Sequence, residues 1–471
     1  MTHFRRRARI VCTIGPACAK RDVLFNLIAK GMDVARLNFS HGSHAFHMGV
    51  AGTLRRGARH CGRPLSLLQD LQGIKIRVGP LKGGSAELRR GEEVRILPGE
   101  GLGDGGVLYV SYPMLLQDAK RGDKVLLDDG FMQLRVTGTA DGALLARVVE
   151  GGIIRDNKGV NFPGMKLSVE SFTPKDRHDL ECGLAMNVDY VAVSFVRSAA
   201  DISKVKRWMR RRGKTIPVIA KIEKAEALSD IDNILEVSDG VMIARGDLGV
   251  EMPPEKVPLI QKGLIEKANG TGKVVITATQ MLESMREHFR PTRAEASDVA
   301  NAVIDGTDAL MLSAETATGR YPLESLAMMD KIIRYTEQWQ EPVVSHIRGT
   351  SDAGALADAA CRAAEDIGAR VLVVYTRSGF TARLLSKFRP KAPVVAYTSD
   401  RHVLSALPLC WGVIPKYMRA PATTEKLCTQ VEKMLTAEGI VRRDDRIVII
   451  TGSPFSEGGK TNFMKIQRIG G

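Results

Sequence analysis

The chain has 471 residues, too many for one ordinary core, so we expect two or three domains. Its net charge of +15 indicates anionic partners, but aromatic residues are only 5% and the basic clusters are short, which argues against nucleic acid as the partner. Because no apolar run has the length of a membrane span or a secretory leader, and the seven cysteines include no C-x-x-C pair, we expect a cytoplasmic protein with reduced thiols and no structural zinc site.

Eight apolar runs follow one another along the chain, and most of them end in polar residues. They span residues 9–15, 33–39, 66–71, 189–195, 217–223, 240–246, 273–280 and 309–316. Near-continuous apolar runs are typical of parallel strands buried on both faces, and most of the intervening segments are long enough for a crossover helix. The pattern therefore predicts an α/β fold, a (β/α)8 TIM barrel, whose site lies at the carboxyl ends of the strands.

The spacing of the runs breaks once, because 117 residues (72–188) separate the third run from the fourth. Short alternating runs broken by Gly and Asp-Gly turns predict a small antiparallel domain here, a β-barrel lid inserted over the barrel mouth. After about residue 340 the alternation restarts and predicts a C-terminal α/β domain. We place the barrel at residues 1–71 and 170–340, the insertion at 72–169 and the C-terminal domain at 341–471.

Two carboxylates follow consecutive runs, Glu223 and Asp247. Neighbouring strands are about 4.8 Å apart, so both side chains can reach one cation. Mg²⁺ or Mn²⁺ would suit these oxygen ligands and would take further oxygens from water and a phosphorylated substrate. The alternative is that both carboxylates form structural ion pairs with neighbouring arginines and lysines.

Cations gather at the same strand ends. Lys221 lies two residues before Glu223 on the same side of its run, where it would stabilise a developing oxyanion or only neutralise carboxylates. Planar guanidinium groups, which can bind phosphate through two N–H donors, come from Arg36, Arg77 and Arg245. The chain shows no Ser/His/Asp set, reactive Cys/His pair or G-x-x-x-x-G-K-[ST] loop, so the residues predict divalent-metal phosphoryl chemistry on an anionic substrate.

Six longer strings then stand out: "ARLNFSHG" (35–42), "DLQGIKIR" (70–77), "IAKIE" (219–223), "ARGDLGVE" (244–251), "TATQMLESM" (277–285) and "PTRAEASDVANAVIDGTDALMLSAETATGRYP" (291–322). Together they resemble the pyruvate kinase family, in the family's order and over nearly the whole chain, and the bacterial members that need no monovalent cation in particular. The resemblance implies transfer of the phosphoryl group of phosphoenolpyruvate to ADP, giving pyruvate and ATP, by a homotetramer.

The resemblance also implies a role for each matching position. Glu223 and Asp247 would bind the divalent metal, and Lys221 would stabilise the transferring group and the enolate. The other implied assignments are the phosphoryl group at Arg36 and Arg77, the substrate carboxylate at Gly246, Asp247 and Thr279, enolate protonation at Thr279 and Ser313, and the nucleotide at Asn38, His41, Arg77 and Lys175.

The C-terminal stretch "YTRSGFTARLLSKFRP" places hydroxyls, an arginine and a glycine before a predicted helix, which together make a phosphate cradle. It resembles the family's effector loop, with a second glycine-rich loop at "TGSPFSEGGKTN". Phe380 stands where many members have a basic residue, so we expect a bisphosphate to be held less well, which favours a sugar monophosphate or a nucleotide. The candidate effector residues are Thr376, Arg377, Ser378, Gly379 and Thr381; the alternative is a plain strand-to-helix turn.

Three residues resemble the family's monovalent-cation site: Asn38, Ser40 and Asp70. Members that need K⁺ commonly have Glu at the position of Lys75, where this chain has an ammonium. We therefore expect Lys75 to supply the charge that K⁺ supplies elsewhere, so that K⁺ is not required. Ile74 replaces the family's usual proline, so we expect a looser hinge before Lys75.

Two other functions fit parts of the pattern. A lyase or mutase acting on phosphoenolpyruvate or an acyl-pyruvate could share the barrel, but the long insertion and the C-terminal domain argue against it. A catalytically idle regulatory protein could use the positive charge to hold RNA, but the intact set of site residues argues against that function.

Overall fold

The computed structural model describes residues 6–339, 351–452 and 461–470. Its central part is a closed barrel of parallel strands in the order β1-β16-β15-β14-β13-β12-β3-β2. Each of the eight predicted runs contributes one strand, so the predicted TIM barrel is confirmed. The strands are β1 (Arg9–Ile14), β2 (Val34–Asn38), β3 (Ser66–Asp70), β12 (Tyr190–Val193), β13 (Val218–Ile222), β14 (Gly240–Ala244), β15 (Val274–Ala278) and β16 (Ala309–Leu312).

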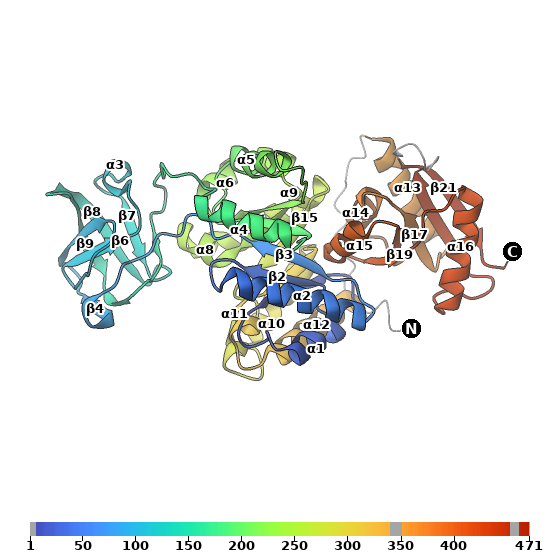
Figure 1. Ribbon diagram of the computed structural model, residues 1–471, viewed down its shortest axis with the longest axis horizontal. Helices are drawn as coiled ribbons and strands as arrows, with labels where there is room; N and C mark the ends of the chain where they lie inside the picture. Colours follow the sequence, from blue (N-terminus) through green and yellow to red (C-terminus); the bar gives the residue numbers. More distant parts are fainter. Residues whose placement is uncertain (1–5, 340–350, 453–460, 471) are drawn as a thin grey trace.

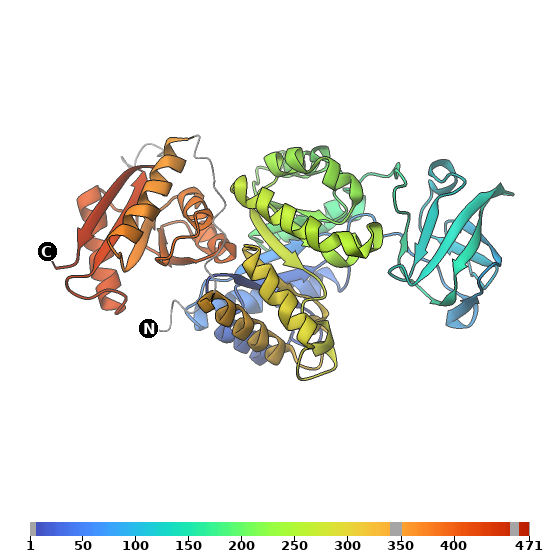
Figure 2. The ribbon, with the colours of Figure 1, turned by 180° about the vertical axis from the view of Figure 1, so that it is seen from behind.

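Helices cover the outside of the barrel on the sides seen in Figure 1 and Figure 2. The strand residues are almost all buried, as expected for a sheet with side chains inside and helices outside. Capping boxes satisfy free N–H groups at the starts of α4 and α10. The barrel helices are α1 (Arg21–Lys30), α2 (His44–His60), α4 (Pro174–Ala185), α5 (Ala199–Arg210), α6 (Ala225–Ser229), α7 (Ile231–Val237), α8 (Arg245–Glu251), α9 (Val257–Gly270), α10 (Arg293–Ile304), α11 (Ala314–Ala317) and α12 (Pro322–Trp339).

The insertion folds around its own apolar core and lies at one end of the molecule (Figure 1). One sheet has the order β11-β7-β8-β9-β5-β6, and a second pairs β10 with β4. The ladders are antiparallel, as predicted, except that β5 and β6 run parallel, because the glycine-rich connection of residues 99–106 carries the chain back to the start of β5. Its elements are β4 (Ser85–Leu88), β5 (Glu93–Pro98), β6 (Val107–Val110), α3 (Leu115–Asp118), β7 (Lys124–Leu127), β8 (Met132–Ala140), β9 (Ala143–Glu150), β10 (Gly152–Arg155) and β11 (Val160–Asn161).

The C-terminal part is a sheet in the order β19-β18-β17-β20-β21, with apolar clusters on both faces. Parallel ladders join β17 to β18 and β20, and β18 to β19, which confirms the predicted α/β domain, and β21 adds an antiparallel edge that we did not predict. No helix in the described part of the chain is long and apolar enough to span a membrane. The elements are α13 (Asp352–Asp366), β17 (Val371–Tyr375), α14 (Phe380–Lys387), β18 (Val394–Thr398), α15 (Arg401–Ala406), β19 (Val413–Tyr417), α16 (Thr424–Ala437), β20 (Arg446–Gly452) and β21 (Thr461–Arg468).

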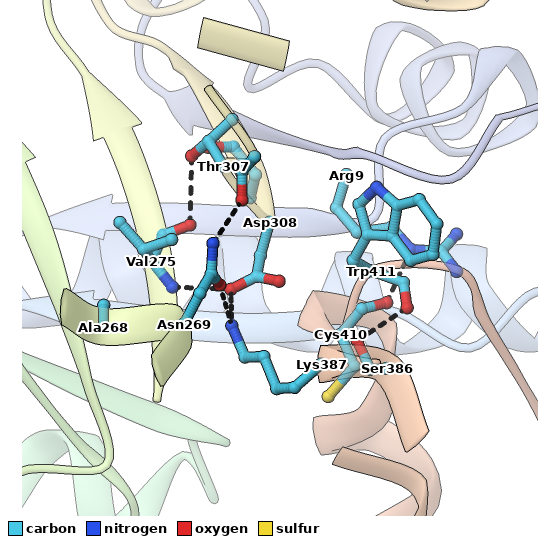
Figure 3. Close-up of polar contacts among 12 residues, drawn as sticks. Arg9, Ala268, Asn269, Val275, Thr307, Asp308, Ser386, Lys387, Cys410 and Trp411 are labelled. Atoms are coloured by element: carbon cyan, nitrogen blue, oxygen red, sulfur yellow. Dashed lines mark hydrogen bonds and ion pairs between the residues drawn. The ribbon is translucent and has the colours of Figure 1, made fainter. Parts of the chain in front are cut away.

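Buried polar groups join this sheet domain to the amino-terminal ends of the barrel strands (Figure 3). Asp308, directly before β16, is bound by the Lys387 ammonium and, at 2.9 Å, by the Arg389 guanidinium. Asn269 Oδ1 accepts a further hydrogen bond from Lys387 at 2.9 Å. Burial lowers the pKa of Lys387 to about 8, with Asp308 opposing and Arg389 reinforcing the shift. The C-terminal domain therefore docks on the side of the barrel opposite to the carboxyl ends of the strands.

Candidate active site

Neighbouring strands bring four charged side chains together at their carboxyl ends. Lys221 Nζ lies 2.9 Å from Glu223 Oε1 and 3.3 Å from Asp70 Oδ1. Arg36 Nε lies 2.6 Å from the other carboxylate oxygen of Asp70. These four residues, the charge cluster, are the ones that the sequence placed at the ends of the second, third and fifth runs.

Mutual attraction keeps Lys221 and Asp70 ionised. Burial acts to lower the pKa of Lys221, but Asp70 and Glu223 outweigh it, so that the pKa is raised. Burial likewise acts to raise the pKa of Asp70, but Lys221 and Arg36 overcome it and lower that pKa. Lys221 is thus a buried ammonium at neutral pH, and a fixed charge of this kind can stabilise negative charge that develops on a reacting group.

Two groups that the sequence reasoning did not select complete the charge cluster. The Ser194 hydroxyl accepts a hydrogen bond from Lys221 Nζ at 2.7 Å and donates to the Leu71 carbonyl at 2.6 Å. The Phe195 N–H donates to Glu223 Oε2 at 2.6 Å, and this residue has a φ of 52°. Ser194 follows the carboxyl end of β12, so its place after a predicted strand could have identified it. The backbone N–H of Phe195, in contrast, leaves no signal in the sequence.

The sequence pairs Glu223 and Asp247 as candidate metal-binding carboxylates. Burial, opposed by Lys221 and reinforced by Asp247, raises the pKa of Glu223. Glu223 forms an ion pair with Lys221, which is the alternative that we considered. Asp247, in the first turn of α8, pairs with no cation in the described chain. Among all the residues that the structure describes, no group of three or more Asp, Glu, His or Cys side chains could hold a metal ion. Two carboxylates with open positions for water and substrate oxygens fit Mg²⁺.

The ends of β14, β15 and β16 bring Gly246, Thr279 and Ser313 to the same side of the barrel. Gly246 N–H donates to the Thr279 hydroxyl at 2.8 Å, and Thr279 has a φ of 68°, which is rare for a β-branched residue. The Ser313 hydroxyl is buried without a partner among the described residues. Arg245 is bound by Asp298 and by the Thr279 carbonyl, each at 2.7 Å. Arg245 therefore stabilises the end of β15, and its guanidinium is not free to bind a phosphate, contrary to our expectation.

Three of the four residues expected around the nucleotide, Asn38, His41 and Lys175, lie at the loop after β2. Asn38 ends β2, and its side chain accepts the Ser40 N–H at 3.1 Å. His41 follows, and burial together with nearby cations lowers its pKa, so its ring is neutral at pH 7. Arg77 lies in the insertion, where its guanidinium donates to the Asn157 carbonyl at 2.9 Å, and its charge is one of those that lower the pKa of His41.

Two lysines lie near the mouth of the barrel. Lys175 Nζ donates to the Phe39 carbonyl at 2.9 Å, in the loop after β2. Lys75 is exposed, forms no hydrogen bond or ion pair within the described residues, and lines a cleft between the insertion and the barrel together with Asp247. It does not contact Asp70, which pairs with the two cations of the charge cluster.

The candidate effector loop precedes α14. Thr376 accepts the Gly379 N–H at 3.0 Å, and Ser378 accepts the Phe380 N–H at 3.4 Å. The Thr381 hydroxyl lies 2.7 Å from that of Thr461. Arg377 belongs to the same loop, while most of the second glycine-rich loop, residues 453–460, lies outside the described residues.

The chain matches two family models, that of the pyruvate kinase barrel domain over residues 5–326 and that of the pyruvate kinase alpha/beta domain over residues 354–467. This chain belongs to the pyruvate kinase family. It is 44% identical over 471 residues to the pyruvate kinase of Mycobacterium tuberculosis, with 99% of each chain covered. It is 43% identical over 473 residues to that of Sporosarcina psychrophila, with 99% of this chain and 81% of the relative covered. The solved structure of a pyruvate kinase from Cryptosporidium parvum is 36% identical, with a TM-score of 0.92 over 99% of this chain and 96% of that one.

The family decides between the functions that the sequence left open. A pyruvate kinase is a phosphotransferase of glycolysis that uses phosphoenolpyruvate and ADP, gives pyruvate and ATP, and generally needs a divalent metal such as Mg²⁺. The lyase or mutase and the idle RNA-binding protein are therefore set aside in favour of the kinase.

Proposed function

We propose that the charge cluster carries the phosphoryl transfer of this pyruvate kinase. The supporting observation is Lys221, a buried ammonium fixed by two carboxylates and by Ser194. Held in this way, it meets the charge that develops on the transferring group and the enolate without having to reorganise. Arg36 is fixed through Nε by Asp70 and through Nη1 by Thr13, which leaves Nη2 for a phosphoryl oxygen.

The metal and the rest of the substrate are assigned to the neighbouring strand ends. Glu223 and Asp247 would hold Mg²⁺ or Mn²⁺, which neutralises charge on the phosphoryl group when bound. The Gly246 and Asp247 N–H groups and the Thr279 hydroxyl would bind the substrate carboxylate. Ser313, whose hydroxyl has no partner in the described chain, would help Thr279 to deliver a proton to the enolate through water and so form pyruvate.

Lys221→Met in the purified protein tests this assignment. We expect ATP formation from phosphoenolpyruvate and ADP to be almost abolished, because a methionine keeps the apolar stem but has no ammonium. Lys204→Met, on the outside of the barrel, is the control for loss of a lysine as such. ATP formation near the unmodified rate in the Lys221 variant would show that the assignment is wrong.

ADP is placed against Asn38, His41, Arg77 and Lys175. The first two follow β2 beside the charge cluster, and Lys175 reaches the same loop. Arg77 is held in the insertion, so we expect it to reach the phosphates when the insertion closes over the barrel.

Closure of the insertion would exclude water that could otherwise accept the phosphoryl group. Hydrogen bonds join the insertion to the barrel: Arg197 donates to the Leu167 and Val169 carbonyls, and Asn161 Nδ2 donates to Glu251 Oε1 at 3.3 Å. Glu251 also pairs with Lys224, the residue after Glu223, so the bond reaches the edge of the site. The proposed hinges lie near residues 72 and 170, and Gly73 has a φ of 65° that favours glycine.

Independence of K⁺ is proposed for the same site. Lys75 exposes an ammonium in the cleft that Asp247 lines, on the side of the mouth nearest the insertion. We expect activity to persist with Na⁺ or an organic cation as the only monovalent cation, and Lys75→Glu to create a need for K⁺. Strong activation of the unmodified protein by K⁺ would contradict the proposal.

Regulation is assigned to the loop before α14, whose hydroxyls and arginine suit a phosphate; its residues are Thr376, Arg377, Ser378, Gly379 and Thr381. We propose that a phosphorylated sugar or nucleotide binds there and activates a cytoplasmic homotetramer. The test is a coupled pyruvate assay with Mg²⁺ across a panel of sugar phosphates and AMP, with the molecular mass measured by light scattering. Rates that no compound changes would argue against an effector site.

A further inference from the structure

Asp179, on α4, is a buried carboxylate whose two oxygens are bound by different elements. Oδ2 lies 2.5 Å from Lys175 Nζ, one turn earlier on the same helix, and Oδ1 lies 2.7 Å from His44 Nε2 on α2. Only 3% of the Asp179 side chain is exposed, against 50% of that of Lys175. The carboxylate is therefore fixed, while the cation that it holds remains open to solvent.

The Lys175 ammonium has two fixed acceptors, Asp179 and the Phe39 carbonyl. An ammonium carries three N–H donors, and the third has no acceptor in the described chain. Phe39 lies between Asn38 and the loop that contains His41, the residues assigned to the nucleotide. The third donor is thus available beside the place proposed for the nucleotide phosphates.

An ordinary helix ion pair does not need this arrangement. A pair of this spacing contributes little when both partners are exposed, and a cation in the first turn of a helix, where Lys175 lies, opposes the helix dipole. A buried carboxylate is also costly unless its lone pairs are satisfied. Asp179 meets that condition only because His44 occupies its second oxygen.

His44 is itself held in place. Its ring lies against that of His178, with centroids 4.7 Å apart, and against that of Phe39, with centroids 5.9 Å apart. Because a carboxylate only accepts hydrogen bonds, Nε2–H of His44 must be the donor to Asp179. The imidazole therefore prevents the carboxylate from turning away from Lys175.

We propose that Asp179 and His44 are positioning residues for Lys175, which fix its ammonium so that one N–H is presented to the phosphates of the nucleotide. The proposal rests on the proposed binding of nucleotide phosphates by Lys175. It adds a carboxylate and an imidazole, neither of which touches the substrate, to the residues that set the affinity for ADP.

The test compares four variants of the full-length protein, with Mg²⁺ present and each substrate varied in turn: His44→Leu, His44→Gln, Asp179→Asn and Lys175→Met. We expect His44→Leu to raise the KM for ADP about fivefold, the effect of losing one ordinary hydrogen bond, and to leave the KM for phosphoenolpyruvate unchanged. His44→Gln keeps a donor and should restore the KM for ADP. His60→Leu, at the far end of the same helix, is the matched control and should change neither constant.

A double variant separates positioning from a general structural role. If His44 acts through Lys175, then His44→Leu adds nothing further to the KM for ADP in the Lys175→Met background. If Lys175→Met raises that KM while His44→Leu and Asp179→Asn leave it unchanged, the positioning role is wrong and the role of Lys175 stands. If Lys175→Met itself leaves the KM unchanged, the proposed nucleotide contact fails and the positioning role with it. Because Asp179→Asn could prevent folding, the His44 variants decide the matter, with thermal melting as the check on folding.

Discussion

Ser194→Ala probes how strongly the position of Lys221 depends on an uncharged neighbour. The substitution removes the acceptor 2.7 Å from Lys221 Nζ and leaves the two carboxylates at 2.9 and 3.3 Å. A hydrogen bond to a charged group contributes about 1.5–3 kcal/mol. Because two ionic partners remain, we take the lower end of that range, which corresponds to a fall in kcat of about 10-fold.

The assay is ATP formation at saturating substrates, with kcat and the KM for phosphoenolpyruvate determined separately. Ser66→Ala is a matched control, because Ser66 is equally buried in a barrel strand but lies at its amino-terminal end, where it donates to the Ser405 carbonyl. We expect that control to keep the unmodified kcat. A Ser194→Ala protein that folds normally and retains kcat within about twofold would refute the view that this hydroxyl positions Lys221.

Three further outcomes follow from the buried contacts. Asp308→Asn leaves two cations buried without a carboxylate and should lower the free energy of unfolding by about 3–5 kcal/mol in urea titrations; an unchanged midpoint would contradict this. Lys387→Met should change the free energy of unfolding only a little at pH 7. Between the folded pKa of Lys387, about 8, and its usual value near 10.4, the unfolded chain binds a proton that the folded chain does not. The free energy of unfolding of the unmodified protein should therefore rise by about 3 kcal/mol relative to that of the variant as the pH increases through this range. A difference between the two proteins that does not change with pH would show that the pKa of Lys387 is not lowered in this way. Asn161→Leu removes the bond from the insertion to Glu251 and should let water compete, so that pyruvate is formed in excess of ATP; equal amounts would show that this bond does not help to exclude water.

The architecture separates two ends of the barrel by function. The C-terminal domain is joined to the amino-terminal ends of the strands through Asp308, and also through the Tyr190 hydroxyl, which donates to the Ala406 carbonyl at 2.9 Å. The charge cluster lies at the opposite ends of the same strands, on the side of the insertion (Figure 1). Docking of the C-terminal domain therefore leaves the mouth of the barrel open to substrates and to the insertion.

The sequence by itself determined the barrel, because a parallel strand buried on both faces must be apolar along its whole length and ends where polar residues begin. The same property brought Glu223, Lys221 and Asp70 forward as site residues, since the carboxyl ends of parallel strands meet at one edge. It also indicated the C-terminal strands, but not the edge strand β21, in which exposed and half-buried positions predominate.

Tertiary structure alone decided which partner each polar group takes. Arg245 resembled Arg36 as a cation at a strand end, yet it is bound by Asp298, 53 residues away, and braces the end of β15. The pairing of Lys387 with Asp308 joins two domains across 79 residues. Local sequence encodes burial and periodicity, whereas the choice of partner depends on which distant segments the closed barrel brings within hydrogen-bonding distance.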